Sequence, residues 1–261
     1  MTEPPTGALG GLRELLRSRR PVLCAFATIP DPGVAAILGA SGFDLVVLDA
    51  EHGPFTRDSG RCCVDALATT PALAAMRVVD DSPATIKAAL DLGVEGILVP
   101  MVADAEQAAA VVRACRFPPR GTRGVGGGHA SRYGTNLGEY LAGADARIAA
   151  MVTIESAVGV ANATAIAAVE GLDAIVIGPT DLAADLGVLG RPDDPHLQAA
   201  IAEITAAAVT AGIPVGIGCR PDAVATRAEQ GMTIFACHED GGGLSAAAEA
   251  TINKARAALQ T

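Results

Sequence analysis

The chain has 261 residues, of which half are apolar and 3% are aromatic, and its formal net charge at pH 7 is -10. This acidic balance predicts no nucleic-acid partner and no membrane partner, and no apolar stretch approaches the roughly 20 residues that span a bilayer. The start, "MTEPPTGALGGLRELLRSRR", has no apolar leader core, and the six cysteines show no CxxC spacing. We therefore expect a cytoplasmic protein with free thiols.

Short apolar segments of strand character alternate with alanine-rich segments of helical character along the sequence. About eight strands are expected, which is the number that closes a (β/α)8 TIM barrel. We predict an α/β fold with a single barrel domain over residues 1–261, and a doubly wound open sheet is the alternative. The expected strands are residues 21–29, 43–50, 71–79, 94–102, 147–155, 172–179, 213–219 and 232–239.

Helix signals lie between the expected strands. The segment "DSPATIKAALDLG", residues 81–93, has a capping side chain, a proline in its first turn and a glycine at its end. The segment "GLRELLRSRR" precedes the first strand and is expected to close the bottom of the barrel. The other expected helices are residues 103–115, 156–170, 195–211, 221–230 and 243–259.

One connection is too long for an ordinary loop. Residues 117–145 read "FPPRGTRGVGGGHASRYGTNLGEYLAGAD", and long loops in compact domains are usually functional. The glycine cluster is not a dinucleotide-binding loop, because no strand precedes it. We interpret the segment as a Gly-rich flap that carries Arg120, Arg123 and backbone amides suited to anions, and a plain surface loop is the alternative.

Ionisable side chains follow several of the expected strands. The carboxyl ends of all strands in an α/β barrel meet at one mouth, where catalytic residues gather. Each side chain alone has a structural explanation, such as a helix cap or a paired ion, but a barrel does not need the whole set there for stability. The set is Asp49, Glu51 and His52 after the second strand, Arg77 in the third, Glu155 at the end of the fifth and Asp181 after the sixth.

The pair Glu155 and Asp181 comes from neighbouring strands, so its carboxylate oxygens can converge. Two carboxylates with open coordination positions suit Mg²⁺ or Mn²⁺, or another hard divalent metal. Such a metal polarises the carbonyl of a bound 2-oxo acid and stabilises the enolate that forms beside it. The two lysines, Lys87 and Lys254, lie inside expected helices, so a Schiff-base aldolase is disfavoured.

The neighbouring groups complete this chemistry. His52 offers a base, and Asp49 a partner that could orient it. Arg77 supplies fixed positive charge to an oxygen that becomes negative during the reaction. These roles predict proton transfer or carbon–carbon bond chemistry next to a carbonyl group.

Several stretches together match one family pattern over about residues 20–190. They are "LVVLDAEHGPF", the arginine of "AAMRV", "GVEGILVPMV", "PPRGTRGVGGG" with "ASRYG", "MVTIESAVGVAN" and "LDAIVIGPTDLAADLG". At these residues the chain resembles the HpcH/HpaI aldolase family, metal-dependent class II pyruvate aldolases related to the citrate lyase β subunit. The resemblance implies a homo-oligomer, a hexamer or a trimer, with C-terminal helices exchanged between neighbours, and "SAAAEATINKARAAL" is the segment for that exchange.

The resemblance also implies a role for each matching residue. Glu155 and Asp181 would bind the divalent metal, and Arg77 would hold the pyruvyl oxygen. His52 would belong to the acid/base machinery, supported by Asp49 and by Asp91 of "ALDLG". The substrate carboxylate would meet the amides around Gly178, Pro179, Thr180 and Asp181.

Two departures from the family pattern are expected near the substrate. Thr153 stands where family members usually have a glutamine, two residues before the metal glutamate, and it is counted among the substrate-binding residues. His129 lies in the glycine cluster where a small or apolar residue is expected. The segment "CHEDGGG" near residue 240 has zinc-like letters, but we interpret it as a strand-to-helix loop.

These residues predict a metal-dependent carbon–carbon lyase. The expected reaction cleaves or forms a 4-hydroxy-2-oxo acid through a metal-stabilised pyruvate enolate, with a 2-oxo acid and an aldehyde as its partners. One alternative keeps the site and changes the electrophile, giving a citrate-synthase-like or acyl-CoA lyase activity. Another alternative is a catalytically silent barrel that acts as a binder.

Overall fold

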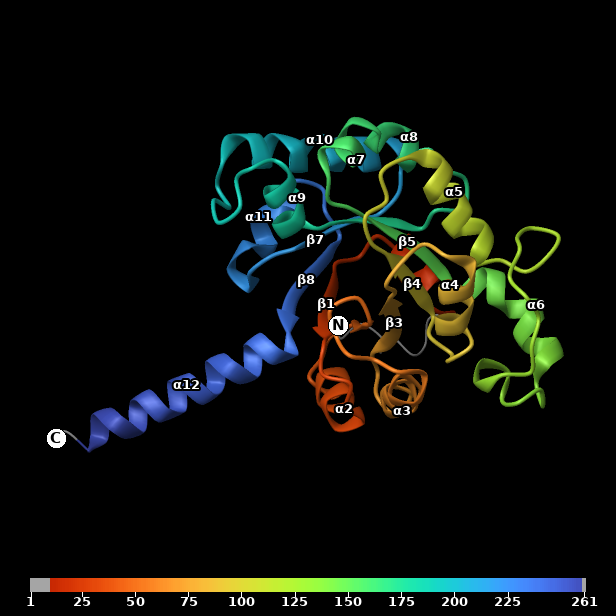
Figure 1. The fold of residues 1–261 in the computed structure, drawn as a ribbon, viewed down its shortest axis with the longest axis horizontal. Helices are drawn as coiled ribbons and strands as arrows, with labels where there is room; N and C mark the ends of the chain where they lie inside the picture. Colours follow the sequence, from red (N-terminus) through yellow and green to blue (C-terminus); the bar gives the residue numbers. More distant parts are fainter. Residues whose placement is uncertain (1–9, 260–261) are drawn as a thin grey trace.

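Eight parallel strands close into a barrel in chain order, with β8 paired to β1 (Figure 1). The computed structural model describes residues 10–259. Residues 1–9 of the segment inspected for a leader lie outside the described residues. The TIM barrel is confirmed, and the open sheet is not formed. The strands are β1 (Val22–Ala27), β2 (Leu45–Asp49), β3 (Leu73–Arg77), β4 (Gly96–Val99), β5 (Ala149–Ile154), β6 (Ala174–Ile177), β7 (Val215–Gly218) and β8 (Ile234–Glu239).

Helices cover the outside of the barrel in alternation with the strands. The helix expected over residues 156–170 is divided at Asn162, and the helices α2, α3, α6 and α9 are additional to the expected ranges. The α-helices are α1 (Leu12–Arg17), α2 (Pro32–Ala40), α3 (Arg57–Leu67), α4 (Pro83–Leu90), α5 (Ala105–Ala114), α6 (Leu137–Arg147), α7 (Ala157–Ala161), α8 (Ala163–Ala167), α9 (Pro179–Asp185), α10 (Pro195–Ala211), α11 (Val224–Glu229) and α12 (Asp240–Ala258).

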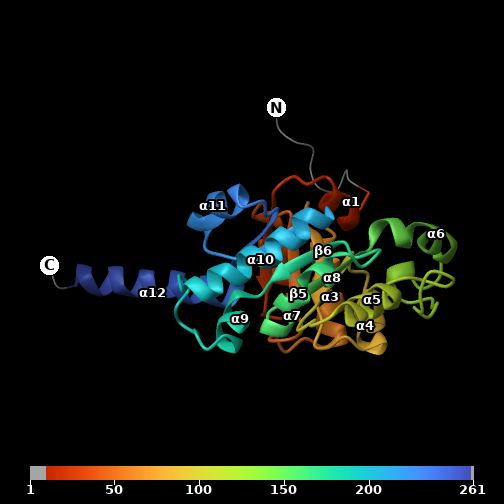
Figure 2. The same cartoon turned by 90° about the horizontal axis from the view of Figure 1, so that it is seen from above.

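The first helix closes the amino-terminal end of the barrel, as the sequence predicts. Leu12, Leu15 and Leu16 of α1 are almost fully buried and pack against strand side chains inside the barrel. Figure 2 shows α1 at this end of the strands. Because this end is plugged by apolar side chains, an open site must lie at the other end, where the strands finish.

The Gly-rich connection lies away from the mouth of its own barrel. Helix α5 begins near the mouth and runs back, so the residues after it return to the amino-terminal end. There Arg13 of the plug helix donates to the carbonyl oxygen of Asp145 at 2.5 Å. His129 contacts the carbonyl oxygen of Leu92 at 2.8 Å and a carboxylate oxygen of Asp65 at 2.8 Å. His129 therefore lies away from the mouth of its own barrel, and the expectation that it lies near the substrate of its own chain is wrong.

The last helix extends away from the barrel (Figure 1). Among its described residues Asp240 alone is buried, and the side chains of Leu244 and Ile252 are largely exposed. An apolar surface of this kind is typical of a helix that packs on another molecule. No helix within residues 10–259 is long and apolar enough to cross a membrane.

Candidate active site

A cavity of about 700 Å³ opens at the carboxyl ends of the strands. Its volume is within the range of pockets that enclose small-molecule ligands. Of the residues predicted from the sequence for this site, those in the cavity lining are Asp49, His52, Arg77, Thr153, Glu155, Gly178, Pro179, Thr180 and Asp181. The structure thus brings together side chains that are up to about 130 residues apart in the chain, because neighbouring strands end at the same mouth.

Arg77, the last residue of β3, is held by two acids, one at the end of β2 and one just after it. Its Nε and Nη2 atoms donate to the two carboxylate oxygens of Asp49 at 2.8 and 2.6 Å. Its Nε atom also lies 3.2 Å from a carboxylate oxygen of Glu51. Asp49 is 1% exposed, so this two-point contact fixes the plane of the guanidinium. Burial alone would lower the pKa of Arg77, but the neighbouring acids raise it.

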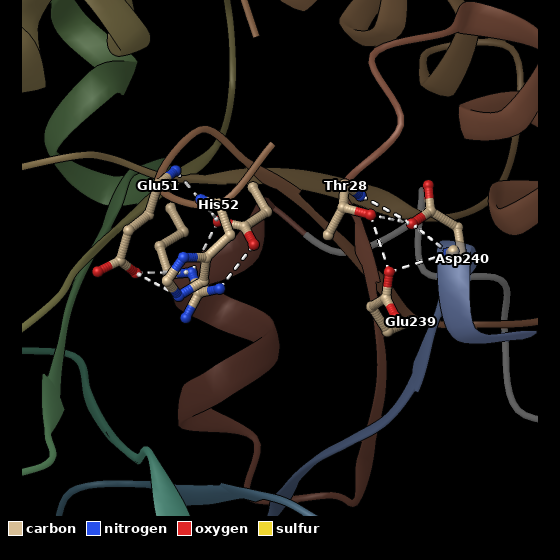
Figure 3. Close-up of polar contacts among 8 residues, drawn as sticks. Thr28, Glu51, His52, Glu239 and Asp240 are labelled. Carbon is tan, nitrogen blue, oxygen red and sulfur yellow. Dashed lines mark hydrogen bonds and ion pairs between the residues drawn. The ribbon is translucent and has the colours of Figure 1, made fainter. Parts of the chain in front are cut away.

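His52 lies at the edge of the cavity with its ring largely exposed. The oxygen of Asp49 that was expected to orient the ring instead accepts the backbone N–H of His52 at 3.4 Å. The ring Nε2 lies 3.8 Å from a carboxylate oxygen of Glu51 (Figure 3). Glu51 is therefore the ring's neighbour in this structure, and it was missing from the predicted catalytic set although it is part of "DAEH".

Glu155 and Asp181 form an acidic pair that follows the neighbouring strands β5 and β6. Glu155 is 3% exposed and accepts the backbone N–H of Met101 at 2.7 Å, whereas Asp181 is exposed. Burial is the main cause that raises the pKa of Glu155, and the negative charges of Asp181 and Glu51 raise it further. A carboxylate in such surroundings gains from a nearby cation.

Close packing around Glu155 restricts its position. Gly178, directly after β6, lies so near that a Cβ atom there would overlap Glu155 Oε2. A side chain at residue 178 would thus occupy the space of the carboxylate. Thr153, two residues earlier on β5, has a buried hydroxyl group without a hydrogen-bond partner among the described residues. Such a group is costly to bury unless a ligand or water contacts it.

Asp91 is the predicted catalytic residue that the structure does not place in the cavity. It caps the end of α4, a helix that starts beside the mouth and ends at the opposite end of the barrel. Its carboxylate accepts a hydrogen bond of 3.0 Å from Arg123. A contact between Asp91 and His52 of the same chain is therefore absent here.

The structure adds a second half to the site, from β7, β8 and β1. Its lining residues include Thr28, Cys219, Arg220, Cys237, His238 and Glu239. The segment "CHEDGGG" is not the expected loop, because β8 runs to Glu239 and α12 begins directly at Asp240. Its first three residues line the cavity. These residues were recognisable from the sequence, because the rule that strand ends face the mouth applies equally to the seventh and eighth strands.

Asp240 ties the start of α12 to the end of β1. Its carboxylate accepts the backbone N–H groups of Thr28 and Ile29 at 2.9 and 3.0 Å, and the Thr28 hydroxyl at 2.7 Å (Figure 3). Burial alone would raise the pKa of Asp240, but these hydrogen bonds outweigh burial and lower it.

Replacing Asp240 with Asn is expected to lower the free energy of unfolding at neutral pH by about 2 kcal/mol, because charge-assisted hydrogen bonds are lost. The folded pKa of Asp240 lies below its unfolded value of about 3.9. This stability is therefore present above about pH 4 and is lost as the pH falls through the folded pKa. Urea unfolding of wild type, Asp240→Asn and the exposed control Asp222→Asn measures this effect. If the difference in the free energy of unfolding between wild type and Asp240→Asn does not shrink in acid, the prediction is contradicted.

The fold and the site define an α/β-barrel enzyme whose acidic and cationic groups gather at the carboxyl ends of its strands. Residues 23–244 match the family described as HpcH/HpaI aldolase/citrate lyase. The chain belongs to this family, and the resemblance predicted from its motifs is confirmed. It is an aldolase, a carbon–carbon lyase.

Individual relatives agree with this assignment. The chain is 41% identical over 223 residues to a hydroxypyruvate/pyruvate aldolase of Chromohalobacter salexigens, covering 84% of this chain and 87% of the relative. It is 43% identical over 192 residues to a 4-hydroxy-2-oxovalerate aldolase of Novosphingobium aromaticivorans, covering 73% of each chain. A crystal structure of a family protein from Burkholderia cenocepacia superposes with a TM-score of 0.90 at 32% identity, covering 94% of this chain and 98% of that one.

Proposed function

We propose that this aldolase is divalent-metal-dependent and cleaves or forms 4-hydroxy-2-oxo acids, with pyruvate as the three-carbon product or donor. The observation that carries the proposal is the carboxylate pair Glu155 and Asp181 in one cavity with Arg77. The pyruvate and oxovalerate aldolases among its relatives support the choice of a 2-oxo acid.

The carboxylate pair fits Mg²⁺ or Mn²⁺. Both ligands supply hard oxygen atoms, and two protein ligands leave room for water and for a bidentate 2-oxo acid. Among residues 10–259 no group of three or more His, Cys, Asp or Glu side chains is arranged to hold a metal, so a softer, fully enclosed site is not offered. When bound, the metal would polarise the carbonyl group of the substrate.

Arg77 and the first turn of α9 would hold the 2-oxo acid. Asp49 accepts the hydrogen bonds of Arg77 Nε and Nη2. The remaining Nη1 group can therefore donate to the substrate's oxo oxygen, whose negative charge grows during cleavage. The hydrogen bonds of α9 begin with Leu182 N–H to Gly178 O. The amides of Thr180 and Asp181 remain for the substrate carboxylate.

His52 would move the proton in cleavage. An imidazole nitrogen takes the proton of the C4 hydroxyl, the C3–C4 bond breaks, and the aldehyde leaves. The electron pair remains on the three-carbon fragment, which becomes pyruvate when C3 takes up a proton. Glu51, beside the ring, stabilises the charged imidazole while it holds the proton.

The exposed C-terminal helix and the position of Asp91 both support a homo-oligomer, a hexamer or a trimer. The apolar side chains of α12 are not buried against the barrel of their own chain. Asp91 lies at the far end of its own barrel, so it can assist only the His52 of another copy. We propose that α12 is exchanged between copies and that Asp91 acts across an interface.

Mixed oligomers test the role of Asp91. The variants His52→Ala and Asp91→Ala should each be weakly active alone. Coexpressed, they should recover roughly a quarter of the wild-type activity, since a random mixture leaves some sites with both residues intact. If Asp91 assisted only its own chain, every copy would keep one defect and coexpression would restore nothing.

The proposed reaction is tested with 4-hydroxy-2-oxovalerate and chelator-treated protein. Pyruvate release should be negligible without metal and should return on addition of Mg²⁺ or Mn²⁺. Cleavage at the same rate without any divalent metal would contradict the proposal, as would no cleavage of any 4-hydroxy-2-oxo acid in a panel of chain lengths.

A further inference from the structure

Arg123 is a buried arginine of the Gly-rich connection, and the proposed chemistry gives it no role. Its side chain is 1% exposed, and its backbone N–H donates to the carbonyl oxygen of Arg116 at 2.9 Å. The guanidinium lies against two aromatic rings, with Cζ 4.6 Å from the centre of the Phe117 ring and 5.5 Å from that of the Tyr140 ring. These rings hold the plane of the guanidinium in one orientation.

A single nitrogen atom makes the side-chain hydrogen bonds of Arg123 to the described residues. Nη2 donates to Asp91 Oδ1 at 3.0 Å and to the Tyr140 hydroxyl at 2.9 Å, whereas the buried Nε and Nη1 have no partner there. Arg116, which is also buried, donates from both of its Nη atoms. Because unpaired buried donors are costly, the arrangement of Arg123 does little for stability and directs attention to its contact with Asp91.

Asp91 lies at a helix end that disfavours its charge. It is the C-terminal capping residue of α4, where the backbone carbonyl groups carry partial negative charge. Arg123 offsets this charge and fixes one carboxylate oxygen. The connection also holds the backbone there, since the Ala130 N–H donates to the Asp91 carbonyl oxygen at 3.2 Å. The Asp91 side chain is 20% exposed, so its second oxygen, Oδ2, can accept a hydrogen bond from another molecule.

We infer that Arg123 is a positioning residue for the cleavage step, which holds the Asp91 carboxylate so that Oδ2 can accept a hydrogen bond from the His52 ring of another copy. This inference rests on the proposed function, because the action of Asp91 across an interface is taken from there. It adds that one copy supplies Asp91 together with Arg123, while the other copy supplies His52.

Steady-state cleavage of 4-hydroxy-2-oxovalerate with saturating Mg²⁺ or Mn²⁺ gives the first test. Arg123→Gln should lower kcat by about tenfold or more, which is part of the factor that a positioned general base contributes. Its KM should stay within about twofold of wild type, because Arg77 and α9 still hold the 2-oxo acid. Arg123→Lys keeps the positive charge and should regain part of kcat. The control Arg113→Gln, exposed on α5, should keep the wild-type kcat.

A double variant tests whether Arg123 acts through Asp91. When Asp91→Ala is already present, Arg123→Gln should lower kcat no further, because the group that Arg123 positions is gone. An arginine that only supported the fold would lower kcat by the same factor with or without Asp91.

Mixed oligomers separate positioning from damage to the fold. Coexpression of Arg123→Gln with His52→Ala should recover roughly a quarter of the wild-type activity, since some sites combine His52 from one variant with Asp91 and Arg123 from the other. Coexpression of Arg123→Gln with Asp91→Ala should give no more than the mean of the two variants alone, because both defects lie on the same side of every site. A barrel damaged by Arg123→Gln would supply no working His52 and would not complement His52→Ala.

Three results would each overturn the inference: wild-type kcat in Arg123→Gln, a further loss of kcat in the Asp91→Ala background, or failure to complement His52→Ala. Wild type itself decides the fate of the proposed function. If wild type shows no metal-dependent cleavage, both proposals are rejected. If it cleaves and any of the three results is found, the metal-dependent aldolase stands and the role of Arg123 is rejected.

Discussion

Replacing Glu155 with Gln should abolish metal-dependent turnover, lowering kcat by at least about 1,000-fold, which corresponds to roughly 4 kcal/mol of the activation barrier. Glutamine keeps the size of the side chain and can still accept the Met101 N–H. It removes one of the two negative charges on which the proposed metal site depends. Mn²⁺ titration by calorimetry should show a matching loss of affinity.

The stability of this variant separates a lost ligand from a damaged fold. Burial raises the pKa of Glu155, so at neutral pH the ionised form costs the folded state some stability when no metal is bound. The neutral glutamine removes this cost, and metal-free Glu155→Gln should melt no lower than wild type. The control Glu203→Gln, on the exposed side of α10, should retain full activity. Unchanged metal-dependent turnover in Glu155→Gln would falsify the metal assignment.

Replacing Arg77 with Gln should lower kcat/KM by about 100- to 1,000-fold, because the charge beside the reacting oxygen is lost. It should also lower the free energy of unfolding by about 3 kcal/mol, because the buried Asp49 is left without its partner. Steady-state kinetics with a 4-hydroxy-2-oxo acid and urea unfolding measure the two effects on the same protein.

A double variant distinguishes these two roles of Arg77. Asp49→Asn combined with Arg77→Gln removes both charges, so it should recover much of the lost stability while remaining inactive. If the double variant regained activity together with stability, Arg77 would serve only the fold. Retention of wild-type turnover by the single variant would be equally incompatible with its proposed role.

The eight strands could be predicted from the sequence because each is a short apolar run. The structure shortens the first seven runs at both ends and the eighth at its start only. Helix α2 was missed although Asp31 caps it and Pro32 starts it, since its glycines weaken the helical pattern. Helix α6 was missed because it follows a glycine cluster and has no side-chain cap. Local signals thus fail where glycine interrupts a helix whose stability comes from packing.

The acidic and cationic groups of the site could be predicted because strand ends converge in a barrel. The predicted barrel also implies that each helix runs back from the mouth, and this rule was not applied to the residues that follow a helix. Asp91 and His129 follow elements that run back from the mouth, so both lie at the other end of their own barrel. The single domain over residues 1–261 and the residue roles stay predictions.

The carboxylate that lies beside the His52 ring could not be predicted from the spacing of residues in the sequence. Asp49 lies three residues before His52, but its oxygens are taken by Arg77 and by backbone amides, which leaves Glu51 beside the ring. Arg220 was overlooked, although the rule that strand ends face the mouth applies equally to the seventh strand.

The most direct test of the account is oxaloacetate decarboxylation by chelator-treated protein, with and without Mg²⁺ and Mn²⁺. This reaction forms the pyruvate enolate without any aldehyde, so it tests the shared chemistry before the second substrate is known. The account predicts pyruvate release that depends on the added metal and is lost in Glu155→Gln. Protein that binds the metal and still releases no pyruvate above the rate of the free ion would contradict it.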